Sequence, residues 1–91
     1  MKTEPDKLLK RHQQLTHSEG LKVISHVQRE EGEWVRHTLM LQGYEVPFVY
    51  RRKQKYQSLQ GASVNLTYYP VEETIAGMAF EQMKVVRIKR A

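Results

Sequence analysis

The residues of this chain best suited to chemistry lie in one basic stretch. The segment YRRKQKY, residues 50–56, places four Lys or Arg side chains between two tyrosines. If the strand expected before it continues, alternation puts Arg51, Lys53 and Lys55 on one face, about 6.6 Å apart. That spacing is close to the phosphate repeat of an extended nucleic-acid strand, about 6–7 Å, so the three charges can follow one backbone. Tyr56 is then placed to stack on a base.

A second basic segment, KVVRIKR at residues 84–90, closes the chain. Its composition predicts a strand, and alternation puts Arg87 and Lys89 on one face with Lys84 and Arg90 on the other. If the two basic strands lie close together, they form one cationic patch of the kind that binds nucleic acid.

A pair of tyrosines marks a third candidate surface. In the strand expected at residues 62–69, alternation turns Tyr68 inward and Tyr69 outward, beside Asn65 and Thr67. An outward row of Asn, Thr and Tyr suits hydrogen bonding and stacking. The predicted nucleic-acid-binding residues are therefore Arg51, Arg52, Lys53, Lys55, Tyr56, Tyr69, Arg87 and Lys89.

Each of these features also has a purely structural interpretation. A Lys/Arg run after a strand is commonly solvated, and lysine on an edge strand discourages aggregation. No RNP-like, KH-like or zinc-knuckle motif accompanies the charges. In that interpretation the positive charge serves solubility or docking to an acidic protein partner.

The net charge of +5 lies entirely in the second half of the chain. Residues 1–45 hold seven Lys/Arg and seven Asp/Glu, whereas residues 46–91 hold eight Lys/Arg and three Glu. This asymmetry indicates an anionic partner for the second half.

The sequence offers little for catalysis or metal binding. The chain has no cysteine, no Gly-rich phosphate loop and no serine in a nucleophile motif. His26 and His37 can face each other across the first hairpin, but a catalytic zinc site needs a third ligand that the pattern does not supply. We therefore expect no enzyme activity, no cofactor and no metal.

The elements that must position these residues are a helix followed by strands. We expect a helical segment over residues 1–20 that ends at Gly20, and a β-rich body over residues 21–91. Within that body, residues 21–29 fit a strand better than a helix, and residues 71–83 fit a helix or a hairpin equally well. The strands expected besides these span residues 34–41, 45–51, 62–69 and 84–90.

The expected architecture is therefore a single α+β domain that is mostly β. Four or five short antiparallel strands in so few residues expose least apolar surface if the sheet curls into a small barrel of the OB or SH3 type. In that barrel Tyr50 joins the core, and Trp34 lies in the core or at the barrel mouth, or else anchors an interface.

Two functions stay open at this point. The first is a small basic module that binds nucleic acid, with RNA or single strands favoured. The second is a protein-interaction or assembly domain, with a homodimer as one form, that uses an edge near Pro47, Trp34 or the surface of residues 78–80. The sequence lacks a transmembrane stretch and an apolar secretory signal, which indicates a cytoplasmic protein with no membrane partner.

Overall fold

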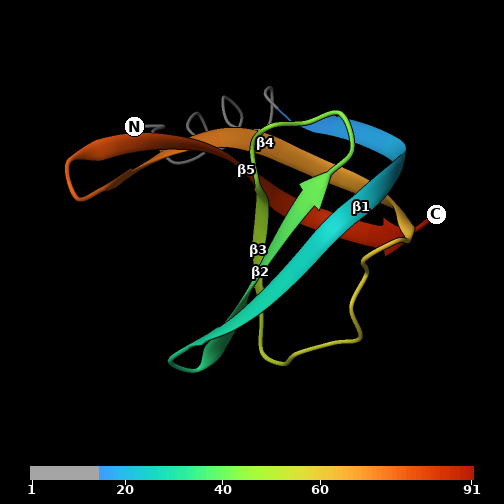
Figure 1. The fold of residues 1–91 in the computed structure, drawn as a ribbon, viewed down its shortest axis with the longest axis horizontal. Coiled ribbons are helices and arrows are strands. Elements are labelled where there is room, and N and C mark those ends of the chain that lie inside the picture. Colours follow the sequence, from blue (N-terminus) through green and yellow to red (C-terminus); the bar gives the residue numbers. More distant parts are fainter. Residues whose placement is uncertain (1–14) are drawn as a thin grey trace, which may run out of the picture.

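The computed structural model describes residues 15–91, and this part of the chain is mostly β (Figure 1). Its five strands are β1 (Thr16–Glu31), β2 (Trp34–Leu41), β3 (Phe48–Arg52), β4 (Ser63–Ile75) and β5 (Met78–Arg90). No helix of the described residues is long and apolar enough to cross a membrane.

The strands form one sheet that closes on itself in the order β1-β2-β3-β5-β4, with β4 returning to β1. β1, β2 and β3 follow one another as antiparallel neighbours, and β4 then lies beside β1, which is a Greek-key connection. β5 closes the ring by running antiparallel to β4 and parallel to β3. The expected all-antiparallel sheet is therefore wrong at one contact, and the sheet is mixed.

The expected helix over residues 1–20 lies largely outside the described residues, and where it overlaps them it is wrong. Residues 16–20 begin β1, and Gly20 lies within that strand at a shift of register between Ser18 and Leu21. Its positive φ of 71° is the backbone conformation that also makes glycine a common helix stop. Here the same freedom produces a β-bulge that bends the strand. β1 can therefore pair with β4 through its first part and with β2 through its second.

β3 is shorter than the sequence predicts. It begins at Phe48, after Pro47, and ends at Arg52. Pro47 therefore does not mark a sheet edge, because β3 lies between β2 and β5 and the Pro47 carbonyl accepts a hydrogen bond from Met83 N–H. Lys53 and Lys55 follow the strand instead of continuing it, so their expected alternation with Arg51 does not occur.

Both segments left between strand and helix are strands. Residues 21–29 belong to β1, and residues 71–83 belong to a long hairpin in which β4 and β5 pair from Val64 and Arg90 to Ile75 and Met78. Gly77 lies in the turn itself with a φ of 81°. The end of this hairpin, residues 70–83, extends to one side of the ring in Figure 1, and we call it the arm.

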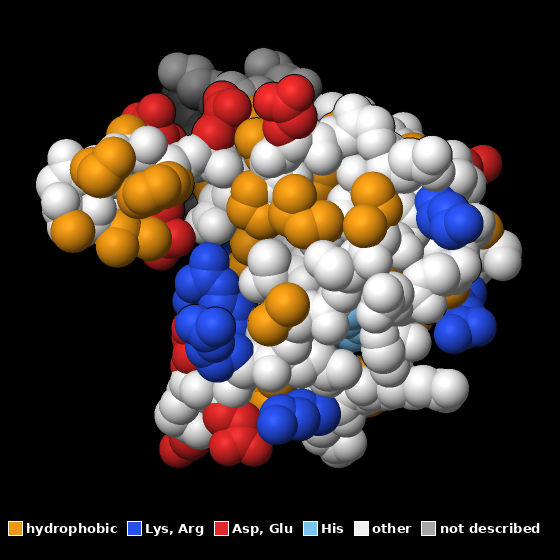
Figure 2. Space-filling model, in the orientation of Figure 1, with side chains coloured by type: hydrophobic (Ala, Val, Ile, Leu, Met, Phe, Trp, Pro, Cys, Tyr) orange, Lys and Arg blue, Asp and Glu red, His pale blue; other side chains and the backbone are white. Residues whose placement is uncertain are grey.

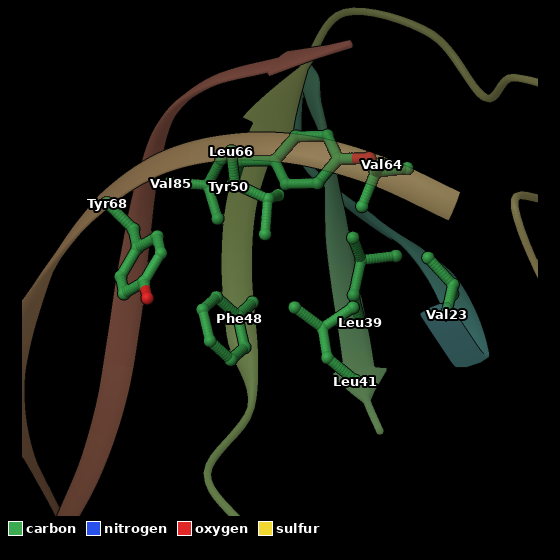
Figure 3. Packing of buried hydrophobic residues seen from close by; sticks show 9 residues of the cluster. All are labelled: Val23, Leu39, Leu41, Phe48, Tyr50, Val64, Leu66, Tyr68 and Val85. Atoms are coloured by element: carbon green, nitrogen blue, oxygen red, sulfur yellow. The ribbon is translucent and has the colours of Figure 1, made fainter. Parts of the chain in front are cut away.

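The core fills the ring with side chains from all five strands (Figure 3). Alternation along β2 points Val35, Leu39 and Leu41 inward, and Tyr50 is buried as predicted. Phe48 is fully buried and contacts the Tyr68 ring edge-to-face at 4.9 Å. The prediction that Tyr68 points inward and Tyr69 outward is confirmed.

Candidate nucleic-acid interface

The basic run YRRKQKY faces the acidic turn between β1 and β2. Arg51 lies 3.5 Å from Glu31, Lys53 lies 3.9 Å from Glu33, and Lys55 lies 3.8 Å from Glu30. Figure 2 shows Lys/Arg and Asp/Glu side chains next to one another at the lower left, where this turn lies. Exposed pairs of this kind add at most about 1 kcal/mol each to stability. Three of the four cations of the run nevertheless have a carboxylate partner.

Arg52 is the member of the run that behaves differently. It points to the opposite side of β3 from Arg51, and its guanidinium lies 4.9 Å from the centre of the Tyr50 ring. One of its N–H groups donates to the Arg51 carbonyl at 2.9 Å. The guanidinium is therefore held in place by an aromatic face and a backbone oxygen.

Five Lys/Arg side chains of the second half remain after the three paired ones are removed. Among residues 15–91, no carboxylate oxygen lies within 4.0 Å of their side-chain nitrogens. These five are Arg52, Lys84, Arg87, Lys89 and Arg90. Four of them lie on β5, so within residues 15–91 the cations of the second half that have no carboxylate partner gather on the last strand instead of in the basic run.

A bulge in β5 changes which of these cations share a face. Thr67 pairs with Arg87 while Tyr68 pairs with Val85, so Val86 is an extra residue in the ladder. Simple alternation predicted that Lys84 and Arg87 lie on different faces of the strand. This prediction is wrong, because the extra residue Val86 shifts the alternation and puts Lys84 on the same outer face as Arg87.

The outer face of β4 and β5 is a ladder of matched pairs. The register sets Tyr69 beside Lys84, Thr67 beside Arg87 and Asn65 beside Lys89. We call these six residues the β5 ladder. Since rungs on one face repeat about every 6.6 Å, the cations are spaced like the phosphates of an extended strand.

Hydrogen bonds from β1 orient the polar members of this ladder. Asn65 accepts the Gly20 N–H at its side-chain oxygen (2.9 Å), which leaves its amide N–H groups as donors. The Thr67 hydroxyl bonds His17 Nδ1 at 2.9 Å, and His17 Nε2 lies 3.0 Å from a Glu19 oxygen. Glu19 is the acidic side chain that borders the hollow formed here by Arg87 and Lys89.

A pocket of about 250 Å³ opens beside the ladder, where β3 and β5 separate. The two strands pair only at Phe48 with Met83 and at Val49 with Lys84. Beyond these pairs, residues of β1, β3, β5 and the β3–β4 connection line the opening. We call it the seam pocket; its lining residues are His26, Tyr50, Arg52, Tyr56, Gln57, Leu59, Ile88, Lys89 and Arg90.

The structure thus divides the predicted site residues among three places. Arg52, Tyr56 and Lys89 meet in the seam pocket. Tyr69, Arg87 and Lys89 belong to the β5 ladder. The other three, Arg51, Lys53 and Lys55, lie against the acidic β1–β2 turn.

Two histidines at the base of the seam pocket form a directed hydrogen-bond chain. Leu59 N–H donates to His26 Nδ1 at 2.9 Å, so the His26 proton lies on Nε2 and is donated to His37 Nδ1 at 2.9 Å. The His37 proton then lies on Nε2, which donates to the Gln54 carbonyl at 3.2 Å. The expectation that these histidines face each other is confirmed. This hydrogen-bond arrangement requires both rings to be neutral, because each Nδ1 accepts a hydrogen bond.

The surroundings of the two rings favour that neutral state. Burial lowers the pKa of His26, and the nearby His37 lowers it further. Burial also lowers the pKa of His37, against a smaller rise from the Gln54 carbonyl. The His37 ring stacks on Tyr50 at 4.8 Å. The one local signal that His37 would be fully buried is its position between Val35 and Leu39 on the same face of β2.

The arm ends in a group of exposed apolar side chains. Ile75, Met78 and Phe80 are about half exposed at its end, and Figure 2 shows this apolar group on the projecting part of the molecule. Trp34 is 44% exposed rather than part of the core, and the Lys53 ammonium lies 4.4 Å from its ring centre.

Comparison with known proteins adds no functional information, because no family model, curated protein or solved structure matches the chain. Within residues 15–91, no group of three or more His, Asp or Glu side chains is arranged to hold a metal ion.

Proposed function

We propose that this protein binds single-stranded nucleic acid along the β5 ladder, and that it acts in the cytoplasm as a binding module without catalysis. The observation that carries this proposal is the register of β4 with β5. It sets three cations on one strand opposite a tyrosine, a threonine and an asparagine on the next. Cations matched to a phosphate backbone, beside groups that stack or hydrogen-bond, are the usual components of a single-strand binding surface.

The fold supports the same function. We infer that this Greek key of five strands in a ring is a barrel of the OB type, a fold that binds oligonucleotides on the face of its second and third strands. In this chain that face carries Arg36 and Arg51, and both lie within 4.0 Å of Glu31. Arg36 also lies 3.6 Å from Glu73 of the arm. Because both arginines already pair with carboxylates, we place the phosphate contacts on β5.

The proposal predicts a steep salt dependence. If the three cations of the β5 ladder, Lys84, Arg87 and Lys89, contact phosphates, the log–log slope of affinity against salt should be about −2.1, at about 0.7 per charge. Arg87→Gln/Lys89→Gln removes two of them and should flatten the slope by about 1.4. Fluorescence anisotropy with a labelled single-stranded RNA, a single-stranded DNA and a duplex, each over a salt series, measures both quantities.

A matched control is available in the basic run. Lys53→Gln/Lys55→Gln removes the same charge from exposed positions that lie against Glu33 and Glu30. We expect this variant to keep the parental slope to within about half a unit, because these cations already face carboxylates. A loss in this variant but not in Arg87→Gln/Lys89→Gln would place the contacts on YRRKQKY instead. Absence of binding at low salt would contradict the proposal and turn attention to the apolar end of the arm as a protein interface.

A further inference from the structure

The seam pocket is a hollow rather than a row of side chains, and three cations border it. Arg52 enters it from β3, and Lys89 and Arg90 enter it from β5. No Asp or Glu is among its described lining residues. Three cations around about 250 Å³ exceed what one phosphodiester requires, because a diester carries a single negative charge. A phosphate monoester carries a charge of about −1.5 to −2 at neutral pH and matches the pocket better.

The other walls of the pocket suit a flat ring. Tyr50 and Tyr56 line it together with the aliphatic side chains of Leu59 and Ile88. Tyr50 is fixed by its stacking on His37, whereas the Tyr56 ring is 53% exposed and lies 5.8 Å from His37. An aromatic wall beside a cationic wall is the combination that a nucleotide requires.

Tyr56 is held at the pocket by its own backbone. Its N–H donates to the Gln28 side-chain oxygen at 2.8 Å, and its carbonyl accepts from the Gln28 side-chain nitrogen at 2.7 Å. The His26–His37 chain holds the same connection at Gln54 and Leu59. The wall that carries Tyr56 is therefore preformed, which lowers the entropy cost of binding.

Lys89 connects the pocket with the ladder. It lines the seam pocket and also the hollow on the outer face that contains Arg87. A strand that follows the β5 ladder towards the end of β5 therefore arrives at the seam pocket.

We infer that the seam pocket binds a terminal nucleotide that bears a phosphate monoester, so that the protein distinguishes the phosphorylated end of a strand. This inference rests on the proposed binding of single strands along the β5 ladder. Arg52, Lys89 and Arg90 contact the phosphate, and Tyr56 stacks on the base.

The test compares short single-stranded RNAs of one sequence that differ only at their ends. The probes carry a 5′-phosphate, a 3′-phosphate or hydroxyl groups at both ends, and unlabelled RNAs compete against one labelled strand. One phosphorylated form should bind about tenfold more tightly than the hydroxyl form, the gain expected from charge-assisted hydrogen bonds to the additional charge. Arg52→Gln should abolish this gain. Arg51→Gln, which changes the neighbouring cation on the opposite side of β3, should preserve it.

The outcomes separate this inference from the proposed function. If the hydroxyl RNA binds with the expected salt slope but neither end phosphate increases affinity twofold, the inference is wrong and the proposed function stands. If the gain survives Arg52→Gln, the inference is also wrong. Arg90→Gln replaces Arg52→Gln if circular dichroism shows that the latter is unfolded.

A mononucleotide tests the pocket when no RNA binds. A nucleoside monophosphate should then shift the NMR signals of His26 and Tyr56, whereas the nucleoside alone should not. If the monophosphate shifts them, the pocket binds phosphate monoesters although the proposed function fails. If it does not, both are wrong.

Discussion

At the scale of single residues, the two buried histidines couple the fold to pH. Each imidazole must accept a hydrogen bond at Nδ1, His26 from Leu59 and His37 from His26. A proton added at either Nδ1 would turn that acceptor into a donor and set two N–H groups against each other. The lowered pKa of each ring has the same consequence, since the folded state resists protonation.

We therefore predict that stability rises with pH around the ordinary histidine pKa of about 6.5. Because both folded-state pKa values are lowered, the unfolded chain binds more protons between the folded and unfolded values. The stabilisation is fully present above about pH 6.5 and is lost as the pH falls from there towards the folded values. Urea unfolding at pH 5, 6, 7 and 8 measures this dependence.

Substitution of the pair identifies the source of that pH dependence. His26→Gln/His37→Gln keeps polar side chains at both positions but removes their titration, so its stability should vary less between pH 5 and 7 than that of the parent. His17→Gln, a change at an exposed histidine of β1, should leave the dependence in place. Equal dependence in all three proteins would mean that other groups cause it.

At the scale of single elements, β1 shows what the sequence could and could not predict. The β-branched residues of 21–29 correctly indicated a strand. Alternation gave the inward position of Tyr68 on β4, because one buried face imposes a period of two. It failed where a strand departs from that period. Gly20 has the freedom needed both for a helix stop and for a bulge, and only the pairing of β1 with β4 decides between them.

The same kind of ambiguity limited how well the candidate site could be predicted from the sequence. The bulge at Val86 has no local sequence signal, so the outer face of β5 could not be assigned correctly from alternation alone. The basic run was conspicuous in the sequence, yet its pairing with Glu30, Glu31 and Glu33 depends on where the β1–β2 turn lies. Ion pairs between distant segments are not encoded in local spacing.

The bulge at Gly20 leads to a prediction about β1. No heavy atom lies within 4 Å of a Cβ added there, so the cost of a larger residue comes from its positive φ alone. Gly20→Val should destabilise the protein by about 1–3 kcal/mol, because a β-branched residue is strained in that conformation. Gly20→Asn should cost less, because asparagine tolerates it. Urea unfolding of both variants checks the order, and equal costs would point to a steric cause instead.

At the scale of the whole molecule, the ring and the arm differ in what they contribute to stability. The two phenylalanines of the chain provide a direct comparison. Phe48 is fully buried at the centre of the ring, and Phe80 is 45% exposed near the end of the arm.

We predict a large difference between the two truncations. Phe48→Ala should cost about 3–5 kcal/mol of unfolding free energy, because it leaves a cavity in the core. Phe80→Ala should cost about 1 kcal/mol or less, as expected for a partly exposed side chain outside the core. Guanidinium unfolding followed by circular dichroism measures both. Similar costs would mean that the arm is packed as tightly as the ring.

The brief contact between β3 and β5 has a consequence for how the ring opens. Only two residue pairs join these strands, whereas β4 and β5 are paired along most of their length. Local opening begins where the fewest contacts must break, so the amides at this junction should exchange with solvent before those of the β4–β5 hairpin. The seam pocket lies at the same junction, between Arg52 and Lys89. A ligand that contacts both strands would therefore hold them together and slow the hydrogen exchange of the amides at the junction of β3 and β5.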